Sequence, residues 1–123
     1  MANSEGINVS LTVYLYIDVD TGGEELRRVY LFDKSITHNL SEMARQAGIY
    51  NELWRPRELD LKYAQALIVP LQRGLESLES NPIFYTKFNP QNGWGSYSGL
   101  VAFVSEYLEA CMAHPRALIE ISR

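Results

Sequence analysis

The sequence predicts an α+β fold with the element order β-β-α-α-α-β, in which a small, mainly antiparallel sheet packs against helices. Apolar and polar residues alternate up to Phe32, whereas apolar residues recur at helical spacing after Asp33. The alternation returns in "ALIEIS" near the end of the chain, which indicates a closing strand. With 123 residues, 46% hydrophobic and 21% charged, the chain is expected to form one domain, residues 1–123, whose core needs no disulfide.

The first two elements are expected to form a β-hairpin. From Ile7 to Val19 the alternation is unbroken, which is typical of a strand with one buried face. The segment "DVDTGGEE" supplies a turn, and "LRRVYLF" resumes the period, so it should pair antiparallel with the first strand. Val29 and Leu31 are expected on the core face. The opposite face should gather aromatic and cationic side chains, namely Tyr14, Tyr16, Arg28, Tyr30 and Phe32.

The stretch "THNLSEMARQAGIYNELWRP" predicts a short helix, a break and one further helical turn. Gly48 suits the break, and Pro56 ends the turn because it restricts the residue before it. Thr37 or Asn39 can cap the first helix, since either side chain can accept a hydrogen bond from a free backbone N–H. Asn39 also has Glu42 three residues on, a spacing close to a capping box.

Two longer helices are expected in the second half of the chain. Between Asp60 and Ser80 the apolar residues recur three and four positions apart, which predicts the longest helix, with Asp60 as its N-cap. A second apolar stripe predicts a helix from about Tyr97 to Ala113. Cys111 belongs to this stripe, so a buried, inert thiol is favoured over a nucleophile.

Composition excludes several classes of function. The net charge of −4 and the pI of 5.1 have the wrong sign for a protein that neutralises many phosphates, so no nucleic-acid partner is expected. No apolar run approaches the roughly 20 residues that span a membrane. One cysteine and a start without an apolar signal segment favour the cytoplasm. Two histidines and that cysteine form no metal-binding spacing, so we expect no metal and no cofactor.

Two segments are candidates for a ligand site. One is the stretch above, and the other is "NPIFYTKFNPQNGWGS", residues 81–96, which lacks a clear period and either closes the core or presents a binding loop. Both lead into helix starts, where free N–H groups attract anions, and Arg55 and Arg57 can add positive charge. The same polar residues can also merely cap their own helices. The candidate ligand-binding residues are Thr37, His38, Asn39, Trp54, Arg55, Asn92, Trp94 and Tyr97.

Three strings together resemble a family of small uncharacterised proteins of bacterial and bacteriophage genomes. They are "THNLSEMARQAGIYNELWRP", "NPQNGWGSYSGLVAFVSEYLEAC" and the closing "ALIEISR". The resemblance covers most of the chain after Asp33 and implies no established activity. It implies only a context, in which small phage-associated proteins act by binding a small molecule or by blocking a host protein.

The sequence therefore favours a non-enzymatic binding protein for a small anionic or nucleotide-like ligand, held between helix N-termini and the 81–96 loop. The alternative is a protein-interaction or inhibitor module whose tyrosine-rich hairpin face contacts a second copy or a host protein. A small enzyme with His38 as acid or base is the third possibility. No nucleophile motif accompanies His38, so no catalytic residue is assigned.

Overall fold

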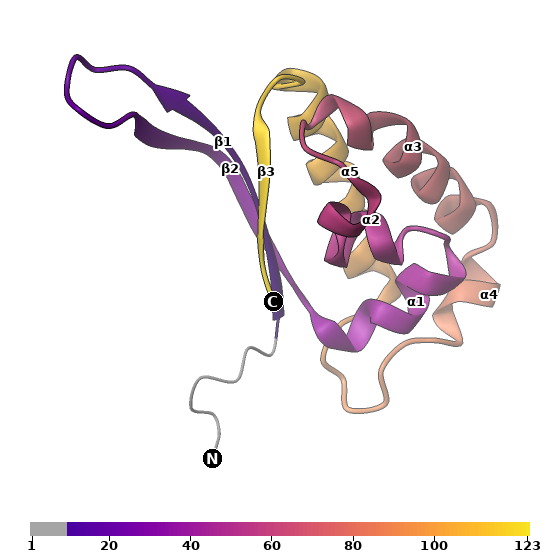
Figure 1. Cartoon of the computed structure of the whole chain (residues 1–123). Coiled ribbons are helices and arrows are strands. Elements are labelled where there is room, and N and C mark those ends of the chain that lie inside the picture. The colour runs from indigo at the N-terminus through magenta and orange to yellow at the C-terminus, as the bar shows by residue number, and fades with distance from the viewer. Residues whose placement is uncertain (1–9) are drawn as a thin grey trace.

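The computed structural model describes residues 10–123, and it confirms the α+β fold (Figure 1). Three antiparallel strands form one sheet in the order β2-β1-β3: β1 (Ser10–Val19), β2 (Arg27–Thr37) and β3 (Leu118–Ser122). The predicted start of the first strand at Ile7 lies outside the described residues. The helices are α1 (Ser41–Gln46), α2 (Tyr50–Trp54), α3 (Gln65–Ser80), α4 (Pro82–Thr86) and α5 (Tyr97–Ala113).

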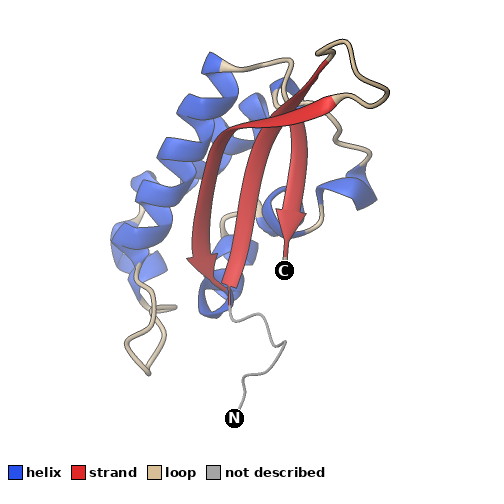
Figure 2. Ribbon diagram, turned by 90° about the vertical axis from the view of Figure 1, so that its left-hand side faces the viewer, coloured by secondary structure: helices blue, strands red, loops and turns tan. Residues whose placement is uncertain are grey.

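The helices cover one face of the sheet only (Figure 1). Figure 2 looks onto the other face, where the strands lie in front and the helices behind them. Alternation in β1 explains this arrangement, because every second side chain points at the helices. The fully enclosed apolar side chains between the two layers include Leu11, Val13, Leu15, Met43, Leu53, Leu67, Leu71 and Phe103.

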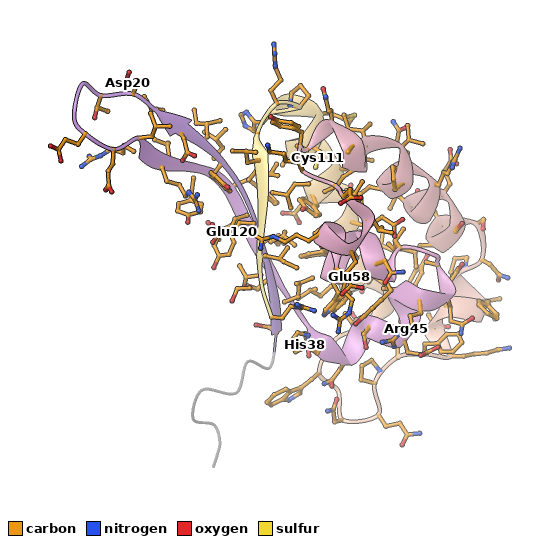
Figure 3. The ribbon with its side chains drawn as sticks, in the orientation of Figure 1. Asp20, His38, Arg45, Glu58, Cys111 and Glu120 are labelled. Carbon is orange, nitrogen blue, oxygen red and sulfur yellow. The ribbon has the colours of Figure 1, made fainter. Side chains whose placement is uncertain are left out.

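The hairpin extends beyond the helical layer, and Asp20 marks its tip (Figure 3). Ile17 and Val29, which pair with each other, are 37% and 39% exposed. The expectation of a buried core face therefore does not hold at this end of the hairpin. Both residues lie on the correct face of the sheet, but no helix reaches that far along the strands (Figure 1).

A β-bulge places Phe32 on the opposite face of the sheet from the one predicted. The register of β1 and β2 shifts after the pair Leu15–Phe32, where Leu31 is the extra residue. One extra residue moves the side chains beyond it to the other face. Phe32 therefore lies on the helical face, where its ring stacks on Tyr107 with centroids 5.9 Å apart, and not on the outer face as predicted.

The segment before α3 also differs from the prediction. Asp60 does not cap this helix, because it ends a 3-10 turn, Pro56–Leu59, in the left-handed conformation with φ 56°. The next residues follow β3 instead: Ile119 N–H donates to Lys62 O at 3.1 Å. The helix begins only at Gln65 and has 16 residues, so α5, with 17, is the longest.

Cys111 is enclosed in the core, as its position in the apolar stripe predicts. Burial raises the pKa of its thiol to about 12. The thiolate is the nucleophilic form of cysteine, so this side chain is inert at neutral pH.

Candidate functional site

The structure divides the eight candidate residues into groups. In the first, the start of the α1 region meets the 81–96 loop. The side-chain amide of Asn39 donates to Asn92 Oδ1 at 3.5 Å and to Trp94 O at 3.4 Å. Gly95, with φ 100°, lies so close to Thr37 that a Cβ there would be 2.7 Å from the threonine methyl group. The two segments are therefore packed against each other.

Polar groups of the first group serve the chain itself. Thr37 Oγ1 accepts from Asn39 N–H at 3.2 Å, so Thr37 caps the 3-10 turn His38–Leu40 that precedes α1. The predicted cap of α1 itself is wrong, because this helix follows Leu40 and no side chain of Thr37 or Asn39 caps it. At the start of α5, Asn89 Oδ1 accepts from Tyr97 N–H at 2.7 Å, and the Tyr97 hydroxyl donates to Leu78 O at 2.6 Å. Capping and loop closure thus account for most of these side chains.

His38 and Trp54 form the second group. The Trp54 indole N–H donates to His38 Nδ1 at 2.9 Å. Trp54 is 2% exposed and stacks on Tyr50 with ring centroids 5.3 Å apart. An indole nitrogen can only donate, so His38 Nδ1 is the acceptor in this bond. The nitrogen that would accept a proton from a substrate is already occupied, which counts against His38 as a general base.

A small cavity of about 190 Å³ lies beside Arg55, on the helical side of β3. Figure 3 shows Glu58 at this position, next to the strand. The Arg55 guanidinium contacts the Glu58 carboxylate at 3.1 Å. The pKa of Arg55 is raised, most strongly by a hydrogen bond with Tyr50 and next by the one with Glu58. The lining residues are Trp54, Arg55, Pro56, Arg57, Glu58, Ile121 and Arg123.

A second cavity, of about 500 Å³, lies further along the same strand. It shares Arg57 with the first cavity, so the two cavities adjoin beside β3, and we call them together the β3 groove. Its lining residues are Tyr16, Arg57, Asp60, Leu61, Lys62, Leu118 and Ile119. Neither cavity is lined by Asn92, Trp94 or Tyr97.

Sequence reasoning found two members of the β3 groove, Arg55 and Arg57, through their charge next to a rigid turn. Two further cations of the groove were not predicted: Lys62, five positions after Arg57, and Arg123, at the far end of the sequence. The alternation of the last strand was the only available signal, and it did not indicate which segment would lie beside that strand.

The outer face of the sheet carries an ordered aromatic cluster. The Tyr30 ring lies 5.4 Å from that of Tyr14 and 6.0 Å from that of Tyr16, measured between centroids. Arg28 lies 3.8 Å above the Tyr16 ring and contacts Glu120 at 2.8 Å. We call these five residues the tyrosine face, and none of the described helices covers it (Figure 2).

Residues 10–123 contain no group of three or more His, Cys, Asp or Glu side chains placed to hold a metal ion. In the same residues, no helix has both the length and the apolar character needed to cross a membrane. No protein-family model, curated protein or solved structure matches the chain. The function must therefore be argued from the geometry of the sites.

Proposed function

We propose that this protein is a non-enzymatic binding protein whose ligand carries a carboxylate or phosphate group, bound in the cavity between Arg55, Arg57 and Arg123. The supporting observation is that three of the chain's 11 basic residues line one cavity, in a chain with a net charge of −4. Arginine is the side chain best suited to hold such groups, because its planar fork can donate two parallel hydrogen bonds. Of the residues that the structure describes, Glu58 is the one acidic residue that lines the same cavity.

The size of the cavity limits what enters it. Its volume of about 190 Å³ is below the roughly 300 Å³ at which pockets for whole drug-sized ligands begin. It suits one anionic group, while the rest of the ligand would extend past Arg57 into the larger cavity. The cavity also has apolar lining, from Trp54, Pro56 and Ile121. Apolar lining reduces solvent access, which strengthens the attraction between an anion and the arginines.

Replacing Arg57 by glutamine is expected to weaken binding of an anionic ligand by roughly tenfold to hundredfold, because a charge-assisted hydrogen bond is lost. The melting temperature should hardly change, since Arg57 lies on the surface. Thermal shift and calorimetry with phosphate, glutarate and adenosine monophosphate would measure both quantities.

Arg73→Gln is the matched control, because it removes the same charge from an exposed position on α3 outside the two cavities. If Arg73→Gln lowers the affinity as much as Arg57→Gln does, the loss reflects the net charge of the protein and not a contact in the cavity. If none of the three anions binds the unaltered protein, the proposal is wrong.

The tyrosine face supports a second candidate function, contact with a second copy of the chain. Tyrosine and arginine are enriched at the centres of protein interfaces, and here both lie on a sheet face that no helix of residues 10–123 covers (Figure 2). The same residues could instead bind a different protein. Sedimentation equilibrium would then detect no self-association.

The double variant Tyr14→Ser, Tyr16→Ser is expected to weaken dimerisation by at least about tenfold, because aromatic anchors dominate interface energies. Sedimentation equilibrium would measure the dissociation constant. Tyr63→Ser is a control, since Tyr63 is 41% exposed and lies outside the tyrosine face. A strictly monomeric unaltered protein at high concentration would exclude this candidate.

A further inference from the structure

We infer that the anionic group bound at Arg55, Arg57 and Arg123 belongs to an extended acidic peptide that adds to the outer edge of β3. This inference rests on the proposed function, from which it takes the arginine cavity, and it names the class of ligand. Three observations support it: the hydrogen-bonding state of the strand edge, the position of the two cavities along that edge, and the charge of their lining.

The first half of the β3 edge is already paired by the chain itself. Ile119 N–H donates to Lys62 O at 3.1 Å, and Ala64 N–H donates to Ala117 O at 2.9 Å. Tyr63 forms an antiparallel bridge with Leu118. This edge therefore accepts an added extended segment in the antiparallel sense.

Within residues 10–123, pairing of this edge stops before Ile121, although the strand continues to Ser122. In an antiparallel ladder, residues two apart direct their N–H and C=O groups to the same side. Since the N–H of Ile119 points away from β1 and toward Lys62, that of Ile121 points the same way, toward the outer edge of β3, and Ile121 also lines the arginine cavity. Ile121 thus presents one donor and one acceptor, the two groups that an added strand pairs with.

The lining of the β3 groove favours an acidic partner. Four cationic residues (Arg55, Arg57, Lys62, Arg123) and two acidic ones (Glu58, Asp60) line its two cavities, an excess of two positive charges. The rest of this acidic chain would repel a negatively charged partner, so the groove also sets where the partner binds. A free phosphate can accept from the arginines, but it cannot form the paired donor and acceptor bonds that a strand forms with the main chain of Ile121.

The probe is the capped peptide acetyl-EVEVE-amide, which alternates acidic and apolar side chains as an added strand requires. It is expected to bind the full chain more tightly than glutarate does, and Arg57→Gln should weaken it by roughly tenfold or more. Methylation of its central backbone nitrogen should also weaken it by roughly tenfold, because one main-chain donor is removed. The basic peptide acetyl-KVKVK-amide should not bind.

Amide exchange of Ile121, followed by NMR, provides the readout that separates the two proposals. Exchange should slow about tenfold with the acidic peptide, whose main chain accepts from this N–H, and should slow less with the N-methylated peptide at the same concentration. If glutarate binds at the arginines, but N-methylation has no effect and Ile121 exchange stays unchanged, the peptide inference is wrong and the proposed function stands. If neither glutarate, phosphate nor the peptide binds, both are wrong.

Discussion

Replacing Gly74 by alanine is expected to destabilise the protein by about 1–3 kcal/mol, although alanine is the better helix former. Gly74 is buried on α3, and a Cβ at this position would overlap the Cγ2 atom of Ile49, which is itself only 1% exposed. The close approach of α3 to the residue before α2 therefore requires the absence of a side chain. Urea denaturation would measure the change in the free energy of unfolding.

The matched control is the same substitution in an Ile49→Ala background. Without the isoleucine branches, Gly74→Ala should become neutral or stabilising by up to about 1 kcal/mol, because the helix propensity of alanine then prevails. A destabilisation of equal size in both backgrounds would contradict the packing explanation. The sign of the change in stability, more than its size, shows whether packing against Ile49 or helix propensity prevails.

His38→Ala is expected to lower the free energy of unfolding by about 1–3 kcal/mol. The substitution leaves the Trp54 indole N–H, part of a residue only 2% exposed, without its acceptor at His38 Nδ1. Chemical denaturation of the variant would give this value. A large loss of stability would show that His38 has a structural role, because a residue that only contacts a ligand would not affect the stability of the free protein.

Two variants test the cause of that loss. His38→Asn should keep most of the stability, because the asparagine carbonyl oxygen can occupy a position similar to that of Nδ1 and accept the same bond. In a Trp54→Phe background, His38→Ala should cost much less, since no indole N–H remains to be satisfied. If His38→Asn and His38→Ala are equally unstable, the hydrogen bond does not explain the effect.

Local periodicity predicted most helices and strands correctly. The α5 helix runs from Tyr97 to Ala113, as its apolar stripe predicts, and Gly48 has the positive φ that its place after α1 requires. The errors occur where contacts between distant segments decide the structure. Phe32 changed faces because of one extra residue in a pairing of strands, and Asp60 lost its capping role because the next residues bind β3.

The candidate site was predicted only in part for the same reason. The meeting of Asn39 with Asn92 and Trp94 agrees with the expectation that the two polar segments come together. Arg55, however, lines a cavity with β3 and not with the 81–96 loop. A sequence shows where an arginine is, but it does not show which distant residues will lie beside that arginine in the folded protein.

By itself, the sequence determined the α+β class, the alternating face of β1 and the burial of Cys111, because each follows from a local repeat of apolar residues. Only the tertiary structure decided that Arg55 and Arg57 lie beside Ile121 and Arg123, more than 60 positions away in the chain. Their meeting depends on the antiparallel pairing of β3 with β1 and on the bonds of residues 62–64 to β3. Such long-range pairing leaves no periodic signal in either segment, which is why the β3 groove appears only in the folded protein.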